Sequence, residues 1–145
     1  MAAEVVREPS IVIIGAGVAG ITAGVVLKRA GFRDFVILEK GSDVGGVWYW
    51  NHYPGLTCDV PSQLYQFAFA PKSDWSAVFA SGPEIQRYHR DVVERFGLTE
   101  HLRLGSEVTA AVFTDPGWEL TLADGTRTTA DFVIAATGVL HHPYT

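Results

Sequence analysis

A glycine-rich turn near the start of the chain carries the first residues whose spacing suggests chemistry. The pattern Gly15-x-Gly17-x-x-Gly20 follows a short β-branched run, Ser10–Ile14, and precedes a helical pattern, Val18–Ala30. In a dinucleotide-binding turn, the first glycine permits the sharp bend and the second lets the backbone approach a pyrophosphate, while the third lets helix and strand pack closely. The phosphate charge meets the N–H groups at the start of the helix. This turn therefore predicts a dinucleotide site.

An acidic residue at the end of the next predicted strand strengthens this prediction. Phe35–Leu38 reads as a buried strand, and Glu39 follows it, about 20 residues beyond Gly20. Two strands joined by one helix form a βαβ unit with parallel neighbouring strands. A carboxylate at this spacing accepts a hydrogen bond from a ribose hydroxyl and repels the 2′-phosphate of NADP, which leaves NAD and FAD as candidates. The alternative is a packing turn with a solvent-facing Glu39.

A long segment without helical or strand period follows, from Lys40 to about Asp59, and it is rich in aromatic residues. Its sequence from Gly45 onward is GGVWYWNHYPGLTCD. Long structureless connections are uncommon in compact domains and are usually functional. A flavin ring needs large planar walls, and Trp48 is a natural candidate for one. The alternative is that these aromatic side chains fill a core beneath a loop.

The remaining chain predicts one helix, a small antiparallel sheet and a final strand. Ser62–Phe67 suggests a short helix, and Gly82–Phe96 predicts a longer one that ends at Gly97. Apolar and polar residues alternate in four segments that predict an antiparallel meander: Leu102–Leu104, Val108–Phe113, Glu119–Leu122 and Arg127–Thr129. Phe132–Ala136 then predicts another buried strand.

Composition excludes several classes of function. The 145 residues suffice for one domain, and a net charge of −5 argues against a nucleic-acid surface. The uncharged run Ile11–Leu27 is shorter than the roughly 20 residues of a membrane-spanning helix, so we expect no membrane insertion. The single cysteine, Cys58, excludes an internal disulfide and suits the cytoplasm. His141 and His142 are adjacent without further ligands, so no metal site is predicted.

The aromatic segment carries a resemblance to a known family. Residues 45–59 resemble the N-terminal FAD signature of class B flavoprotein monooxygenases, and most closely that of Baeyer–Villiger monooxygenases. These proteins have Gly-Gly-x-Trp, an aromatic run, Tyr-Pro-Gly and Cys-Asp at this spacing. Thr137-Gly138 resembles the Ala-Thr-Gly segment that closes the FAD fold of related flavoproteins. The resemblance covers nearly the whole chain and implies an α/β, Rossmann-like three-layer FAD-binding domain over residues 1–145, with a parallel sheet and an added antiparallel β-meander.

The resemblance also implies which residues contact FAD. Carried over by position, these are Gly15, Gly17, Ala19 and Gly20 at the pyrophosphate, Glu39 at the adenosine ribose, Gly46, Val47 and Trp48 along the ribityl chain and flavin, Asp59 and Tyr65 beside the flavin, the backbone of Val108 at the adenine, and Thr137 and Gly138 in the closing segment. Asp59 is the one catalytic candidate, because the family's aspartate here neighbours an active-site arginine of the NADPH domain. The alternative is a structural carboxylate. Thr57 departs from the family, since many members have arginine there.

For the complete enzyme, the resemblance implies an NADPH- and O2-dependent oxidation. NADPH reduces FAD, oxygen adds to the flavin as a peroxide, and the peroxide attacks a ketone to give an ester or lactone. The family's second glycine motif and its fingerprint would lie beyond Thr145, so we expect an incomplete FAD domain that is inactive alone and needs an NADPH domain in cis or trans. The alternatives are a nitrogen- or sulfur-oxidising flavin monooxygenase and a non-catalytic FAD- or NAD-binding module.

Overall fold

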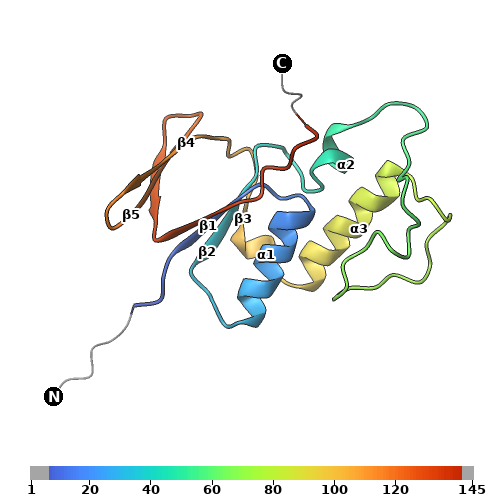
Figure 1. The fold of residues 1–145 in the computed structure, drawn as a ribbon, viewed down its shortest axis with the longest axis horizontal. Helices are drawn as coiled ribbons and strands as arrows, with labels where there is room; N and C mark the ends of the chain where they lie inside the picture. Colours follow the sequence, from blue (N-terminus) through green and yellow to red (C-terminus); the bar gives the residue numbers. More distant parts are fainter. Residues whose placement is uncertain (1–6, 142–145) are drawn as a thin grey trace.

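A parallel four-stranded sheet forms the middle of three layers in the computed structural model, which describes residues 7–141 (Figure 1). Its strands lie in the order β3-β2-β1-β7, and each neighbouring pair is parallel. The bounds are Ile11–Ile14 for β1, Phe35–Leu38 for β2, Leu102–Arg103 for β3 and Phe132–Ala135 for β7. The predicted parallel pairing of the first two strands is confirmed.

Both faces of β1 are covered, which explains its continuous β-branched sequence. Ile11 and Ile13 pack into the cluster that contains the helices, whereas Val12 packs into a second cluster on the opposite side. Side chains alternate between the two faces of a strand, so a strand that is buried on both faces must be apolar at every position. Ile13 lies opposite Ile37 of β2 in the parallel register and is fully buried.

Two helices cover one face of this sheet. Helix α1 spans Val18–Arg29 and helix α3 spans Gly82–Arg95, and Figure 1 shows them side by side. Gly24 brings α1 close to the sheet, because a Cβ atom there would lie 2.9 Å from Cδ1 of Ile37. Both helices end as predicted: Gly31 and Gly97, just beyond their last turns, have positive φ.

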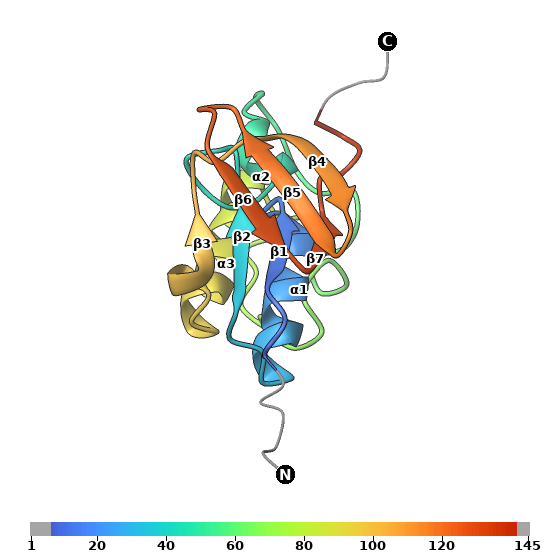
Figure 2. The same cartoon turned by 90° about the vertical axis from the view of Figure 1, so that its left-hand side faces the viewer.

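The antiparallel meander covers the other face of the parallel sheet (Figure 2). Its strands are β4, Val108–Thr114, β5, Gly117–Leu122, and β6, Arg127–Ala130, in the order β4-β5-β6. Leu120 is completely buried and clusters with Ala130 of the meander and with Val12 and Leu38 of the parallel sheet. The predicted three-layer α/β fold with an added meander is therefore confirmed.

Two element predictions were wrong. Leu102–Leu104 does not belong to the meander, because Leu102 pairs with Ile37 of β2 at the edge of the parallel sheet. Alternation of apolar and polar residues predicts a strand but does not show which strand it pairs with. Ser62–Phe67 forms turns instead of a helix. The reason is that Ser62 bonds to a distant segment, since its hydroxyl donates to Val78 O at 2.9 Å and accepts from Ala80 N at 2.8 Å.

Two further features differ from the expectation. The aromatic segment, which was expected to be structureless, contains a short helix, α2, Val47–Trp50. Outside that segment, a 3-10 turn, η1, spans Thr99–His101. A helix of four residues is too short to produce a periodic sequence signal. Strand β7 was expected to be buried, but Phe132 is 58% exposed because β7 lies at an edge of the sheet.

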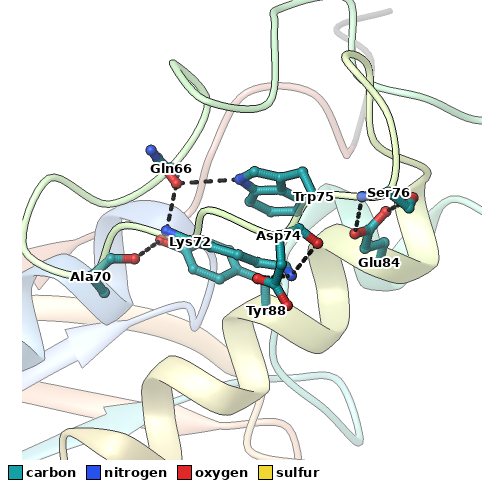
Figure 3. Close-up of polar contacts among 8 residues, drawn as sticks. All are labelled: Gln66, Ala70, Lys72, Asp74, Trp75, Ser76, Glu84 and Tyr88. Atoms are coloured by element: carbon teal, nitrogen blue, oxygen red, sulfur yellow. Dashed lines mark hydrogen bonds and ion pairs between the residues drawn. The ribbon is translucent and has the colours of Figure 1, made fainter.

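The segment between α2 and α3 is tied to α3 by a polar network (Figure 3). The buried Tyr88 hydroxyl donates to Ala70 O and accepts from Phe67 N, both at 2.8 Å. Glu84 accepts from the backbone N–H of Ser76 at 3.0 Å and from the Ser76 hydroxyl. These hydrogen bonds hold the pKa of the Glu84 carboxyl below its ordinary value. The network fixes the position of α3.

Tyr88→Phe tests this attachment. The substitution removes one hydroxyl and leaves the Phe67 N–H and the Ala70 carbonyl without that partner. Each buried polar group that loses its hydrogen bond costs about 1–3 kcal/mol, so we expect the free energy of unfolding to fall by at least about 2 kcal/mol. Urea unfolding followed by circular dichroism measures it. A variant as stable as the wild type would show that the hydroxyl does not hold the segment.

Candidate cofactor-binding site

A cavity of about 480 Å³ opens at the carboxyl edge of the parallel sheet. Ile14 at the end of β1, Leu38 at the end of β2 and Ala136 just after β7 line it. Its volume lies within the usual range for small-molecule sites. Open α/β sheets bind ligands at this edge, because the loops and helix N-termini that can contact a ligand converge there.

The glycine turn between β1 and α1 forms one wall of the cavity. Gly15 has a φ of 103°, and a Cβ atom there would lie 2.5 Å from Ala136 O. Gly17 caps α1 without a side-chain hydrogen bond, and Gly17, Val18 and Ala19 all line the cavity. The first N–H groups of a helix have no intrahelical acceptor. This wall therefore offers N–H donors and the positive end of a helix dipole to an anion.

Gly20 has a different role from the other glycines of the motif. A Cβ atom on Gly20 would lie 1.8 Å from Gly15 O, far inside any permitted contact. Gly20 is buried and does not line the cavity. It is the glycine that lets the helix start directly beneath the turn.

Glu39 holds the end of β2 against the glycine turn. Its side chain is buried, with Oε2 accepting from Ala16 N and Oε1 accepting from Gly41 N, each at 2.7 Å. Glu39 also lines the cavity. Each carboxylate oxygen has two lone pairs, so a further donor, such as a ligand hydroxyl, can be accommodated.

The loop that precedes α2 closes the cavity from the side of the glycine turn. Gly46 has φ 56° and ψ −125°, a conformation that residues with a Cβ rarely adopt. A Cβ atom on Gly46 would lie 3.0 Å from Cα of Gly17, so the two backbones are in close approach. Gly45 N donates to Ala16 O at 3.0 Å. The two glycine segments thus form a continuous backbone surface.

Nine of the residues predicted to contact the cofactor line this one cavity: Gly15, Gly17, Ala19, Glu39, Gly46, Val47, Val108, Thr137 and Gly138. Four others lie away from its lining: Gly20, Trp48, Asp59 and Tyr65. Trp48 is buried against Cys58 and Ile85, and its Nε1 donates to the Tyr65 hydroxyl at 3.1 Å. Asp59 is exposed.

Several lining residues were not predicted as contacts from the sequence, among them Lys40, Trp50, Ser106, Glu107, Leu140 and His141. Trp50, rather than Trp48, presents its ring here: its centroid lies 4.5 Å from that of His141 and 5.3 Å from Nζ of Lys40. Only the short helix α2 decides which aromatic residue faces the cavity. Ser106 and Glu107 immediately precede Val108, a predicted contact, and this closeness in sequence could have predicted that they line the same cavity.

His89 is a buried titratable group behind the Gly45–Gly46 segment. Its ring is buried and lies beside the backbone of Gly45. Burial lowers the pKa of His89 from 6.5 to about 4, and the polar backbone of Gly45 beside the ring offsets this only in part. The imidazole is therefore neutral at neutral pH.

Acidification is expected to destabilise the protein through His89. Between pH 6.5 and pH 4 the His89 ring binds more protons in the unfolded chain than in the folded chain. The contribution of neutral His89 to the free energy of unfolding is therefore fully present above pH 6.5 and is lost as the pH falls toward 4. The difference amounts to roughly 3 kcal/mol. Urea unfolding of wild type and His89→Gln at several pH values measures it. Equal slopes in both proteins between pH 6.5 and pH 4.5 would contradict this assignment.

Residues 7–141 contain neither of two other kinds of site. No cluster of three or more histidine, cysteine, aspartate or glutamate side chains there is arranged to hold a metal ion. No helix within those residues has the length and apolar character needed to cross a bilayer. His142 lies outside the described residues.

Comparison with known proteins places this geometry in a family. Residues 12–145 match the model of the pyridine nucleotide-disulphide oxidoreductase family. An uncharacterized monooxygenase of Mycobacterium tuberculosis is 50% identical over 94% of this chain and 28% of its own length. A Baeyer–Villiger monooxygenase of Streptomyces coelicolor is 44% identical over 97% of this chain and 27% of its own length.

Solved structures agree with the sequence relatives. The crystal structure of OTEMO in complex with FAD and NADP superposes with a TM-score of 0.87, at 37% identity, over 96% of this chain and 27% of that one. This chain therefore spans little more than a quarter of the length of the proteins it matches. The chain belongs to the pyridine nucleotide-disulphide oxidoreductase family, and it corresponds to the FAD-binding region of class B flavin monooxygenases, as its Gly45–Asp59 segment predicts.

Proposed function

We propose that this chain binds FAD as the FAD-binding part of an NADPH- and O2-dependent Baeyer–Villiger monooxygenase. One observation carries the proposal: the start of α1, the buried carboxylate of Glu39 and the Gly46 backbone converge on a single cavity. These groups fit a dinucleotide, because N–H donors suit a pyrophosphate and a carboxylate suits a ribose.

Each part of FAD is assigned to residues that line the cavity or support them. Gly15, Gly17 and Ala19 contact the pyrophosphate, Glu39 accepts from the adenosine ribose, and the backbone of Val108 meets the adenine. Gly46 and Val47 lie along the ribityl chain, and Thr137 and Gly138 close the opposite side. Trp48 and Tyr65 support the flavin side through their mutual hydrogen bond, and Gly20 acts by allowing the turn.

In the complete enzyme, FAD supplies the oxidising chemistry, and the protein orients the reactants and excludes water. We propose a ketone as the substrate, supported by the Baeyer–Villiger relative at 44% identity. Asp59 is the proposed catalytic residue; its exposed position leaves it accessible to an NADPH domain supplied in cis or in trans. We further propose a cytoplasmic location, which the single buried cysteine suits.

A substrate panel tests the reaction class. The complete protein that contains this chain is supplied with NADPH and O2 and offered a cyclic ketone, a thioether or a tertiary amine. We expect a lactone from the ketone, with NADPH consumption that depends on the ketone. Formation of a sulfoxide or an N-oxide without any lactone would overturn the Baeyer–Villiger assignment and favour a heteroatom monooxygenase.

A further inference from the structure

The loop Asp43–Gly46 lies between the candidate cofactor cavity and helix α3. On the cavity side, Gly45 N is bonded to Ala16 O and Gly46 lies against Gly17. The conformation at Gly46 is one that only glycine adopts readily, so local preference alone does not select it. Contacts from another part of the chain are needed to hold the loop in this position.

One face of α3 makes the contacts that can do so. Gln86, His89 and Arg90 are three and four residues apart, which places them on the same side of a helix. Arg90 Nε donates to Oδ2 of Asp43 at 2.6 Å, and its terminal nitrogen makes an ion pair with the same oxygen. Three successive side chains of this face therefore point to one short loop.

The other two contacts reach the loop backbone. Gln86 Nε2 donates to Val44 O at 3.3 Å, and the buried His89 ring lies beside the backbone of Gly45. The Gln86 side chain also touches the loop directly, because a Cβ atom on Gly45 would lie 3.0 Å from its Cγ. Arg90 and Gln86 thus bond to consecutive residues of the loop, and the His89 ring lies behind the next one.

His89 indicates that this face serves more than stability. Its Nδ1 is buried and has no hydrogen-bond partner among the described residues. A buried polar atom without a partner costs about 1–3 kcal/mol, and an apolar side chain would avoid that cost. The ring lies beside the backbone of Gly45, in the loop next to the cavity.

We propose that the α3 face formed by Gln86, His89 and Arg90 is a positioning element for the cofactor cavity, which holds the Asp43–Gly46 loop against the glycine turn and thereby sets the affinity for FAD. The inference rests on the proposed function. Its physical basis is preorganisation: a loop already held in its bound conformation loses less freedom when the ligand binds. The network of Figure 3 holds α3 itself in place from its other side.

The test separates positioning from overall stability. Gln86→Ala/Arg90→Ala removes two partly exposed side chains, so the global fold is retained. Arg87→Ala is the matched control, because it removes the same charge from an exposed position of the same helix. Two quantities are measured: the Kd for FAD, by titration of flavin fluorescence, and the hydrogen–deuterium exchange of residues 43–50 without FAD.

The double variant is expected to bind FAD about five- to tenfold more weakly and to exchange faster at residues 43–50, while Arg87→Ala matches the wild type. Asp43→Ala should reproduce the effect of Arg90→Ala, and combining these two should add little. If the wild type binds FAD and the double variant binds equally well with unchanged exchange, the inference is overturned alone. If the wild type does not bind FAD, the proposed function fails and the inference fails with it.

Discussion

Glu39→Ala is expected to weaken FAD binding at least tenfold and to lower the free energy of unfolding by about 2–6 kcal/mol. The carboxylate accepts from Ala16 N and Gly41 N in a buried position, so its removal leaves two donors without these partners. Each such loss costs about 1–3 kcal/mol. The affinity falls for a second reason, since the acceptor proposed for the ribose is gone. Urea unfolding measures the first effect and a flavin fluorescence titration the second.

Glu39→Gln is the matched control for this change. It keeps the size of the side chain and one oxygen acceptor but replaces the other oxygen with a donor. We expect a stability loss smaller than that of the alanine variant, together with weaker FAD binding. Unchanged FAD affinity in both variants would rule out the ribose role, and unchanged stability would rule out the link between the two loops.

Gly20→Ala is expected to prevent correct folding of the β1–α1 turn. The added methyl group would lie 1.8 Å from Gly15 O, and that obstacle is backbone rather than the end of a flexible side chain. The helix would have to move away from the sheet, which disrupts the core around Ile21. We expect a loss of more than 3 kcal/mol, as for other severe steric conflicts in a core, or no soluble protein. Soluble yield and thermal unfolding measure the effect.

Gly17→Ala provides the contrast. A Cβ atom there would lie 3.5 Å from Cα of Gly46, an ordinary contact, and the φ of −82° at Gly17 suits any residue. This variant should fold with near-normal stability yet bind FAD more weakly, because the added methyl group keeps the pyrophosphate from approaching the backbone at this position. A Gly20→Ala protein with the wild-type melting temperature would contradict the packing role of Gly20.

Much of the parallel sheet and its helices could be predicted, because their signals are local. Ile11–Ile14 and Phe35–Leu38 are short apolar runs, and Gly31 and Gly97 mark the ends of helices. Glycine spacing and the position of Glu39 also predicted part of the cavity wall, namely Gly15, Gly17 and Glu39. Each of these features is encoded within a few consecutive residues.

The features that could not be predicted depend on contacts between distant segments. Leu102 lies in the parallel sheet because it pairs with Ile37. Ser62 forms hydrogen bonds to Val78 and Ala80 instead of starting a helix. Likewise, α2 turns Trp50 toward the cavity and Trp48 into a core with Tyr65, although both lie in one aromatic run. Sequence shows that aromatic side chains are present but not which way each one faces.

The central claim is that the cavity at the carboxyl edge of the sheet binds the ADP half of FAD. The most direct measurement is a titration of FAD with the purified chain, followed by flavin fluorescence and by the visible spectrum after gel filtration. We predict a yellow protein with about one FAD per chain, from which ADP displaces the flavin and FMN does not. A colourless chain that leaves the fluorescence of FAD unchanged at every concentration would contradict the account.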